Sequence, residues 1–320
     1  MSQTTTKTPK RLFACCLTNF APSANYGGDS GGGPYRPIQR ITRRKLEYPI
    51  VSAEAIRSAW REVLATLGLA CSRKRILSDE NPRVQFDPGT PNENLFADEF
   101  FFGYMFTKST GRIGKRQSPI QNNKAMGVLP YRGDTSFHQY PKQSFGTEDA
   151  PKKGKKEKAE GEEEGEGDTK GGGLFQSEVS HNAFQYPFAM DLEECGKKPL
   201  WTRTLLEALA QLTHVSGNQT RSWFEFNPAS IILRATDSLT CEFDQYPFVA
   251  DEATERVSAP SVFQAILDGD LPGREFYVGG NLVRHMEGKL REELQAKEVH
   301  LHTSVKQVIE ILCEAILPKE

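Results

Sequence analysis

The sequence predicts an α+β fold, in which helices pack on a β-sheet. Apolar runs of strand length alternate with segments whose apolar residues return at helical spacing. Their order along the chain is strand, helix, strand and then strand, helix, strands, which is typical of an α+β sandwich of the ferredoxin or RNA-recognition type. With 320 residues and 37% hydrophobic content, the chain can bury one large core or two small ones.

A strand and a capped helix open this fold. Residues 11–20, rich in Leu, Phe and Cys, predict the strand, and residues 52–67 predict the helix. Ser52 is the expected N-cap, because a serine side chain accepts a hydrogen bond from the free N–H groups of the first turn. Arg57 and Arg61 are four residues apart, so we expect them together on the flank of the helix. The expected buried stripe consists of Ile56, Trp60, Val63, Leu64 and Leu67.

The middle of the chain is less regular. Residues 72–95 predict an irregular connection because of their prolines, and the apolar run within residues 95–108 fits either a strand or a helix. Residues 146–173 are dominated by Lys, Glu and Gly, so they predict a disordered loop without apolar side chains to bury. Strand-like sequence flanks this loop, so we expect it at the tip of an excursion from the core, with a domain linker as the alternative.

The last part of the chain returns to regular structure. Strands are predicted at residues 184–192, 221–226 and 230–236. Helices are predicted at residues 202–214, 260–267, 283–295 and 304–316.

Charge is distributed unevenly along the chain. Residues 1–145 hold 21 Lys and Arg against 11 Asp and Glu, whereas residues 174–320 hold 13 against 22. A basic first half predicts a polyanionic partner, and the alternative is a soluble protein with an uneven surface charge.

Cations gather at three places in this basic half, and the helix start is one of them. The start of a helix presents free N–H groups and the positive end of the helix dipole, which suits a phosphate. Nearby arginines add bidentate contacts, although an ordinary capped and solvated helix would show the same residues. The candidate residues are Arg40, Arg43, Arg44 and Lys45; Ser52 with Arg57 and Arg61; and Lys115 with Arg116.

A glycine-rich loop at residues 24–35 precedes the first of these cation groups. Its five glycines make the loop flexible or allow a close approach to a ligand, but it lacks the Lys-Ser/Thr ending of a P-loop. Asp29 in this loop is a weak indication of metal-assisted cleavage, because a lone aspartate more often shapes a turn. Six aromatic residues in loop-like sequence suit stacking on single-stranded bases, with core packing as the alternative. They are Tyr26, Tyr35, Tyr131, Phe137, His138 and Tyr140.

The sequence predicts no catalytic centre, metal or cofactor. None of the six histidines has a convincing nucleophile or metal-ligand partner, and the six cysteines show no C-x-x-C spacing. Cys15 and Cys16 lie in a strand-like run, where buried free thiols are common. We therefore expect the protein to work in a reducing cytoplasm. The N-terminus lacks an apolar signal core, and no stretch approaches the length of a membrane span.

Several short motifs resemble one known family. They are ANYGGD at residues 24–29, TRR at 42–44, YPIVSAEAIRSAWR at 48–61, FGYM at 102–105, KRQSP at 115–119 and SGNQTR at 216–221. They resemble the DevR branch of the CRISPR-associated backbone family (the Cas protein seven family), whose members are the repeated subunits of type I Cascade surveillance complexes. The motifs are most similar to those of subtype I-B members, and the resemblance runs from about residue 11 to 236.

The resemblance implies a hand-shaped protein. Residues 11–117 and 188–320 would form an RNA-recognition-motif palm with inserted finger elements, and residues 118–187 a β-hairpin thumb that contains the disordered loop. Copies would stack head to tail along the spacer of the crRNA guide, hold its sugar-phosphate backbone and present its bases in segments to the target DNA strand. Other Cascade subunits are the remaining partners. On the matched positions it also implies RNA contacts at Asn25, Tyr26, Gln219 and Arg221.

Two other functions stay open. Type I members of the family do not cut, but some relatives in type III complexes cleave target RNA with an aspartate in the loop after the first strand. Asp29 therefore keeps an RNA endonuclease with a divalent metal as the alternative. A DNA-binding regulator is the third hypothesis, which the lack of a helix-turn-helix pattern disfavours.

Overall fold

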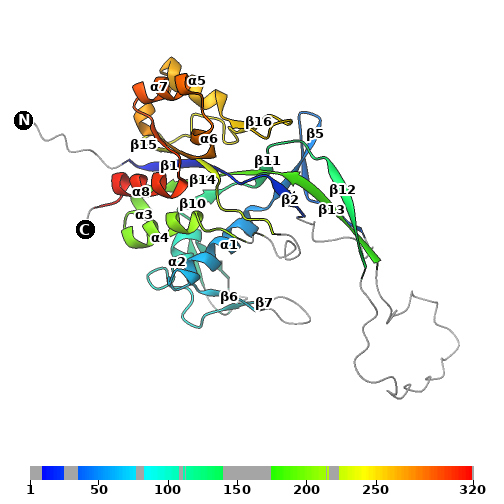
Figure 1. Ribbon diagram of the computed structural model, residues 1–320. Helices are drawn as coiled ribbons and strands as arrows, with labels where there is room; N and C mark the ends of the chain where they lie inside the picture. The colour runs from blue at the N-terminus through cyan, green and yellow to red at the C-terminus, as the bar shows by residue number, and fades with distance from the viewer. Residues whose placement is uncertain are drawn as a thin grey trace, which may run out of the picture.

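A nine-stranded sheet organises the described part of the chain (Figure 1). The computed structural model describes residues 9–24, 35–76, 83–107, 111, 113–139, 174–213, 215 and 223–318. The strand order is β19-β18-β15-β1-β14-β11-β5-β4, and β10 also pairs with β14. The strands are β1 (Arg11–Leu17), β4 (Arg40–Arg43), β5 (Leu46–Val51), β10 (Ile120–Asn122), β11 (Ala125–Gly127), β14 (Phe184–Asp191), β15 (Ser230–Thr236), β18 (Phe276–Gly280) and β19 (His300–His302).

The first strand lies at the centre of this sheet. β1 pairs antiparallel with β14 on one side and with β15 on the other. Successive side chains of a strand point to opposite faces, and here both faces are covered over most of the strand, which explains the nearly continuous apolar sequence of β1. Leu12, Ala14 and Cys16 join one core, and Cys15 joins the other. Burial raises the pKa of the Cys15 thiol, so it stays protonated.

One face of the sheet carries the larger core. The helices on this face are α1 (Ala53–Thr66), α2 (Ala97–Phe102), α3 (Leu192–Cys195), α4 (Pro199–Leu209) and α8 (Val305–Ile316), drawn below the sheet in Figure 1. Trp60 on α1 is 1% exposed and meets the Phe188 ring edge-on at 5.6 Å between centroids. Its indole N–H donates to the carbonyl oxygen of Leu205 at 2.9 Å, so the tryptophan joins α1 to α4 and to the sheet.

The opposite face is covered over part of its area. The helices α5 (Pro260–Asp268), α6 (Asn281–Arg284) and α7 (Gly288–Ala296) form this second layer, together with the short strands β16 (Val249–Ala250) and β17 (Val257–Ser258). Their apolar side chains cover Leu17, Ile232 and Val278. The end of β1 that carries Arg11 and Phe13 lies outside this cover and lines an open hollow instead.

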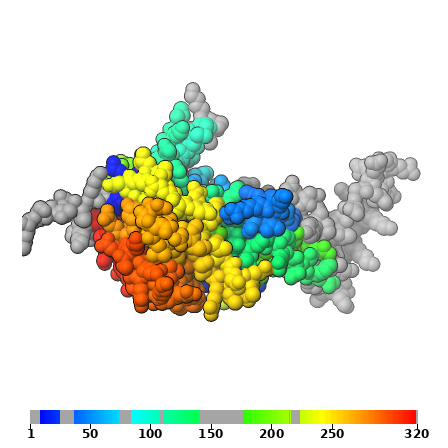
Figure 2. Space-filling model, turned by 90° about the horizontal axis from the view of Figure 1, so that it is seen from above, coloured from blue at the N-terminus to red at the C-terminus, as the bar shows by residue number. Residues whose placement is uncertain are grey.

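Three hairpins project from this two-layer body. Two lie in the segment between α1 and β10: β6 (Arg73–Ile76) with β7 (Arg83–Phe86), and β8 (Tyr104–Phe106) with β9 (Gly114–Arg116). The third joins β12 (Gly133–Gln139) to β13 (Leu174–Asn182) in antiparallel register, and β2 (Ala21–Ser23) and β3 (Tyr35–Arg36) pair with β13. In the space-filling view the β8–β9 segment (teal) and the β12–β13 hairpin (green) both extend from the body (Figure 2).

The α+β prediction is confirmed, and so are most of its elements. The strand predicted at residues 11–20 is β1, and the predicted helix at 52–67 is α1 with Ser52 as its N-cap. The strands at 184–192 and 230–236 and the helices at 260–267 and 304–316 also form. The strand-like sequence beside residues 146–173 forms the β12–β13 hairpin, whereas the disorder predicted for 146–173 concerns residues outside the described part.

Some elements differ from their predictions. Residues 72–95 are not irregular throughout, because they contain β6 and β7, and the apolar run of 95–108 is both helix α2 and strand β8. The turn between α2 and β8 requires Gly103, whose φ is +65° and whose added Cβ would lie 2.5 Å from the Arg116 carbonyl oxygen. The helix predicted at 283–295 is two helices, α6 and α7.

Two further boundaries also differ. Residues 223–226 are not a strand, and α4 begins at Pro199 and ends at Leu209 rather than spanning 202–214. The interval 118–187 contains β10, β11 and the start of β14 besides the hairpin, so part of it belongs to the central sheet. Among the helices of the described residues, none has the length and apolar character needed to cross a membrane.

Candidate nucleic-acid interface

The predicted site at the helix start is built on the N-cap of α1. Ser52 Oγ accepts a hydrogen bond from the Ala55 N–H at 3.2 Å, and the other N–H groups of the first turn are not satisfied within the helix. The Ala53 carbonyl oxygen accepts a hydrogen bond from the Asn122 amide at 3.0 Å, which places the helix start against β10. Glu54 is exposed in the same turn and brings a negative charge to it.

Arg57 holds α1 to the sheet. Its Nε donates to Asn122 Oδ1, and its Nη2 donates to the Ile120 carbonyl oxygen at 3.1 Å. Partial burial lowers the pKa of this guanidinium, and Glu54 opposes that shift. Two of the donors of Arg57 are therefore used inside the chain, and its other guanidinium N–H groups have no hydrogen-bond partner among the described residues.

Arg61 is more deeply placed than Arg57. Its side chain is 14% exposed, lies 4.8 Å above the Phe102 ring and has Nε 3.9 Å from Asp98 Oδ2. Burial and the neighbouring Arg73 lower the pKa of Arg61 to about 10, so it remains charged at neutral pH. The predicted placement of both arginines on one flank is found, but this flank packs against β10 and α2.

The β4–β5 hairpin carries the densest group of predicted cations. Arg40 pairs with Glu47 at 2.9 Å and with Glu178 at 3.6 Å, and its guanidinium lies 4.5 Å from the Tyr131 ring centroid. Arg43 lies 3.8 Å from Asp244. These two arginines connect the hairpin to β13 and to the second layer of the fold.

Arg44 and Lys45 form the tip of the same hairpin. They are the two residues between the paired Arg43 and Leu46, and their φ angles are +49° and +66°. Two successive residues at positive φ are the pattern of a type I′ turn, in which Asn and Gly are favoured and other residues are strained. Both side chains are exposed, and neither has an ion-pair partner among the described residues. The tip thus presents two free positive charges.

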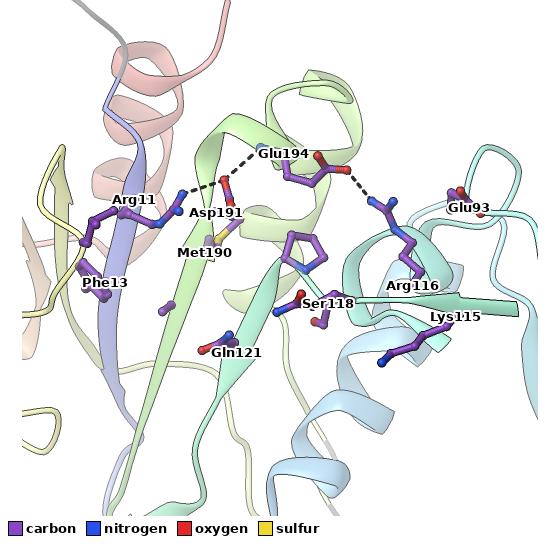
Figure 3. A pocket seen from close by; sticks show the side chains of 14 residues that line it. Arg11, Phe13, Glu93, Lys115, Arg116, Ser118, Gln121, Met190, Asp191 and Glu194 are labelled. Atoms are coloured by element: carbon purple, nitrogen blue, oxygen red, sulfur yellow. Dashed lines mark hydrogen bonds and ion pairs between the residues drawn. The ribbon is translucent and has the colours of Figure 1, made fainter. Parts of the chain in front are cut away.

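Lys115 and Arg116 line a cleft of about 660 Å³ beside the open end of the sheet (Figure 3). Arg116 Nη2 lies 2.8 Å from Glu194 Oε1, and Arg11 lies 2.9 Å from Asp191. Lys197 and Arg116 lower the pKa of Glu194, which keeps this carboxylate ionised. The arginines of the cleft are thereby neutralised, whereas Lys115 is exposed without an ion-pair partner in the described part of the chain.

A second hollow of about 530 Å³ continues the cleft across the sheet. The two share Phe13 of β1, Gln121 of β10, Ala189 of β14 and Leu239, and we call the combined surface the sheet-face groove. No sequence motif predicts this groove, although the alternation of β1 puts Phe13 on the face opposite Leu12 and Ala14. A ring and an amide at its centre suit stacking and hydrogen bonding with neutral groups better than phosphate binding.

The remaining predicted site residues lie outside the described part of the chain. They are Asn25, Tyr26 and Asp29 in the glycine-rich loop, and Gln219 and Arg221. Their placement in the interface stays a prediction.

A curated relative aligns with nearly the whole chain. It is described as "CRISPR-associated protein Cas7/Cst2/DevR" of Myxococcus xanthus (strain DK1622), and it is 25% identical over 316 residues, which cover 95% of this chain and 97% of the relative. The chain is a homologue of this Cas7/Cst2/DevR protein. The family resemblance expected from the short motifs is confirmed, although no protein-family model matches the sequence.

Solved structures share the fold of this Cas7/Cst2/DevR homologue. A chain of a "CRISPR RNA-guided surveillance complex, pre-nicking" matches with a TM-score of 0.58 and 13% identity, over 96% of this chain and 100% of that chain. A chain of a "CRISPR RNA-guided surveillance complex" matches with a TM-score of 0.54 and 18% identity, over 95% and 99% of the two chains. The mixed α+β architecture with its large central sheet is therefore that of subunits found in such complexes.

Proposed function

We propose that this Cas7/Cst2/DevR homologue is a backbone subunit of a type I CRISPR Cascade surveillance complex. Copies polymerise head to tail along the crRNA spacer, hold its sugar-phosphate backbone and present its bases in segments to the target DNA strand. Other Cascade subunits complete the complex, and the protein works in the cytoplasm without a cofactor. The observation that carries the proposal is the alignment with the curated relative over 95% of this chain and 97% of the relative.

The arrangement of elements supports a hand-shaped subunit. With other elements inserted between them, β1, α1, β11, β14, α4 and β15 come in the order strand, helix, strand, strand, helix, strand, which is the order of an RNA-recognition palm. Their four strands pair antiparallel within the central sheet in the order β15-β1-β14-β11. The β6–β9 hairpins serve as the fingers inserted before β10, and the β12–β13 hairpin serves as the thumb. A head-to-tail contact between copies is heterologous, so it builds an open helix along the guide.

Phosphate contacts in this proposal come from cations that the fold leaves free. Arg44 and Lys45 at the β4–β5 tip and Lys115 beside the sheet-face groove lack ion-pair partners among the described residues. Arg57 adds its free donors at the start of α1, next to the N–H groups that Ser52 leaves unsatisfied. Arg40, Arg61 and Arg116 support these positions from within the chain.

The purified protein should carry RNA of discrete length after expression with its CRISPR array and companion subunits. Extraction and sizing of the bound nucleic acid tests this, with the β4–β5 tip variant described below as the control. Binding of single-stranded RNA should also fall steeply with salt, because each phosphate contact releases counterions. A salt-independent affinity, or a preference for duplex DNA, would contradict the proposal.

The subunit is proposed to hold RNA without cutting it. The assembled complex, incubated with magnesium and target RNA, should leave that RNA intact. Cuts at regular intervals that disappear in Asp29→Ala would show that the protein is an RNA endonuclease and not a scaffold that leaves RNA intact. The proposal that it binds RNA would still stand.

The helix start gives a separate prediction. Ser52→Asp should leave the melting temperature unchanged or slightly raised, because Asp caps a helix as well as Ser and its charge suits the helix dipole. RNA affinity should fall about tenfold at 50 mM salt, which is the value of roughly one phosphate contact. Ser52→Asn is the matched control, since it caps the helix without a charge and should bind RNA normally. Equal affinities of the Asp and Asn variants would mean that no phosphate lies at this helix start.

A further inference from the structure

Trp223 is the most exposed tryptophan of the chain. Its side chain is 81% exposed, whereas Trp60 is 1% exposed and Trp201 is partly buried beneath the Lys198 ammonium. Isolated apolar side chains are common on protein surfaces and need no explanation by themselves. Trp223 differs in two respects. The backbone that follows it is held by buried side chains, and this anchor belongs to the same core as α1.

Phe224 and Phe226, which follow Trp223 in the chain, anchor its backbone. Phe224 is 1% exposed and meets the Phe184 ring edge-on at 5.6 Å, and Phe226 is fully buried. The Phe226 N–H donates to the Thr213 carbonyl oxygen at 3.2 Å, and the Tyr186 hydroxyl donates to the Phe226 carbonyl oxygen at 2.6 Å. Because Phe224 points into the core, Trp223 projects from a fixed backbone. Binding at such a ring requires no ordering of the backbone that carries it.

The strand that holds the anchor, β14, lies two strands away from β5, which leads into α1. Phe184 pairs with Gly127 of β11, and the next residue of β14 pairs with Met126, which in turn pairs with Ile50 of β5. Two spacings between neighbouring strands are about 10 Å. Ser52 follows Ile50 by two residues, and Phe184 and Ile56 belong to the same core on the same face of the sheet. Stacked nucleotides rise about 3.4 Å each, so about three of them span the distance between these two strands, and further nucleotides reach Ser52.

We propose that Trp223 is a stacking platform for an unpaired base of the guide RNA whose phosphates lie at the start of α1. The inference rests on the proposed function and assigns one further contact within it. Every base has a π-face, so stacking on an indole is independent of sequence and suits a guide whose spacer varies. The other occupant that an exposed tryptophan fits is a second copy of the chain, and the test separates the two.

Fluorescence reports directly on this contact. Trp223 is the exposed indole among three tryptophans, so titration with a short single-stranded RNA should quench the emission of the unmodified protein. Trp223→Phe should bind the RNA with nearly the same affinity, because it keeps a ring, and should show little quenching. Trp223→Leu keeps an apolar side chain without a ring and should bind RNA as weakly as Trp223→Ala. None of these changes should alter the melting temperature appreciably, since the side chain is 81% exposed.

A double-mutant cycle with abasic RNA isolates the stacking itself. Trp223→Ala should weaken binding of intact RNA about tenfold, within the range measured for base–aromatic stacking, and should add no further loss on RNA that lacks its bases. If Trp223→Ala binds intact RNA as tightly as the unmodified protein, the inference is wrong while the proposed function stands. If the variant changes only the oligomeric state in sedimentation, Trp223 contacts another copy and the inference is also wrong. If the unmodified protein fails to bind RNA, the proposed function itself fails.

Discussion

Replacing Arg44 by Asn together with Lys45 by Gly should weaken RNA binding by roughly 50- to 100-fold at 50 mM salt and by about tenfold at 200 mM. The pair of substitutions removes two free positive charges at the tip of the β4–β5 hairpin. Each phosphate contact on a single strand contributes about 0.7 to the slope of affinity against salt, so the slope should fall by about 1.4. Filter binding of a short single-stranded RNA at several salt concentrations measures both quantities.

The same variant should be at least as stable as the unmodified chain. Arg44 and Lys45 have φ angles of +49° and +66°, which residues other than Gly, Asn and Asp adopt only under strain. Asn followed by Gly is the sequence that a type I′ turn prefers, so the hairpin should gain stability while it loses affinity. A rise in melting temperature with a fall in RNA affinity would indicate that the two cations are kept for binding and not for folding.

Two controls separate a phosphate contact from a general effect of net charge. The exchange Arg44→Lys with Lys45→Arg keeps both charges and should bind normally. Lys289→Gln with Lys306→Gln removes two exposed charges from the acidic half of the chain and should change affinity little. If this distant pair weakens binding as strongly as the tip variant, long-range attraction explains the effect and the tip makes no specific contact.

The elements that the sequence predicts well are those whose signals are local. Ser52 and Ser304 mark the starts of α1 and α8 because each accepts a hydrogen bond from an N–H three residues later, at 3.2 and 3.4 Å. The β6–β7 hairpin was missed because it pairs only with itself outside the central sheet. Each strand of this hairpin has four residues, and the alternation in β7 consists of Val84 and Phe86 alone, both exposed, so residues 73–86 carry a weak strand pattern.

The candidate site shows a different limit. The positions of the cations can be read from the sequence. The sequence does not show which of them already form ion pairs or hydrogen bonds inside the protein, because their partners are remote in the chain. Arg57 donates to Asn122 and Ile120, 65 and 63 residues away. In the sequence, Arg44 and Lys45 look like the neighbouring cations Arg40 and Arg43. The hairpin geometry shows that Arg40 and Arg43 have ion-pair partners, whereas Arg44 and Lys45 have none among the described residues. The fold, and not the number of charged residues, therefore decides which cations are free at the candidate interface.

The loop that borders the sheet-face groove depends in the same way on one buried charge, that of Arg234 on β15. This side chain is 3% exposed and donates to Glu275 at 2.8 Å, and it forms a 2.7 Å ion pair with Glu242. It also donates to the Cys241 carbonyl oxygen at 2.9 Å, and its guanidinium lies 5.6 Å from the Phe276 ring centroid. These contacts fix the segment that supplies Leu239 and Gln245 to the groove. Arg234 also holds the pKa of Glu242 below its usual range.

Arg234→Met should therefore lower the free energy of unfolding by about 3 kcal/mol, the lower end of the cost of removing one partner of a buried ion pair. Thermal or urea denaturation measures this, and the melting temperature should fall by roughly 6 °C or more. The lower end applies because Glu275 is 23% exposed and water can reach it when its partner is lost. The small contribution of Glu242 is lost as the pH falls through its lowered pKa, so the difference between the two proteins should shrink slightly in acid.

Glu275→Gln added to Arg234→Met distinguishes an unpaired charge from lost packing. An unpaired carboxylate is the main cost in the single variant, so neutralising it should restore part of the stability, as replacing both partners of a buried pair often does. Glu242→Gln alone should change the melting temperature little, because this carboxylate lies at the surface. If the double variant is no more stable than Arg234→Met, the loss comes from the hydrogen bond to Cys241 and from packing on Phe276, and the ion pairs contribute little to the groove wall.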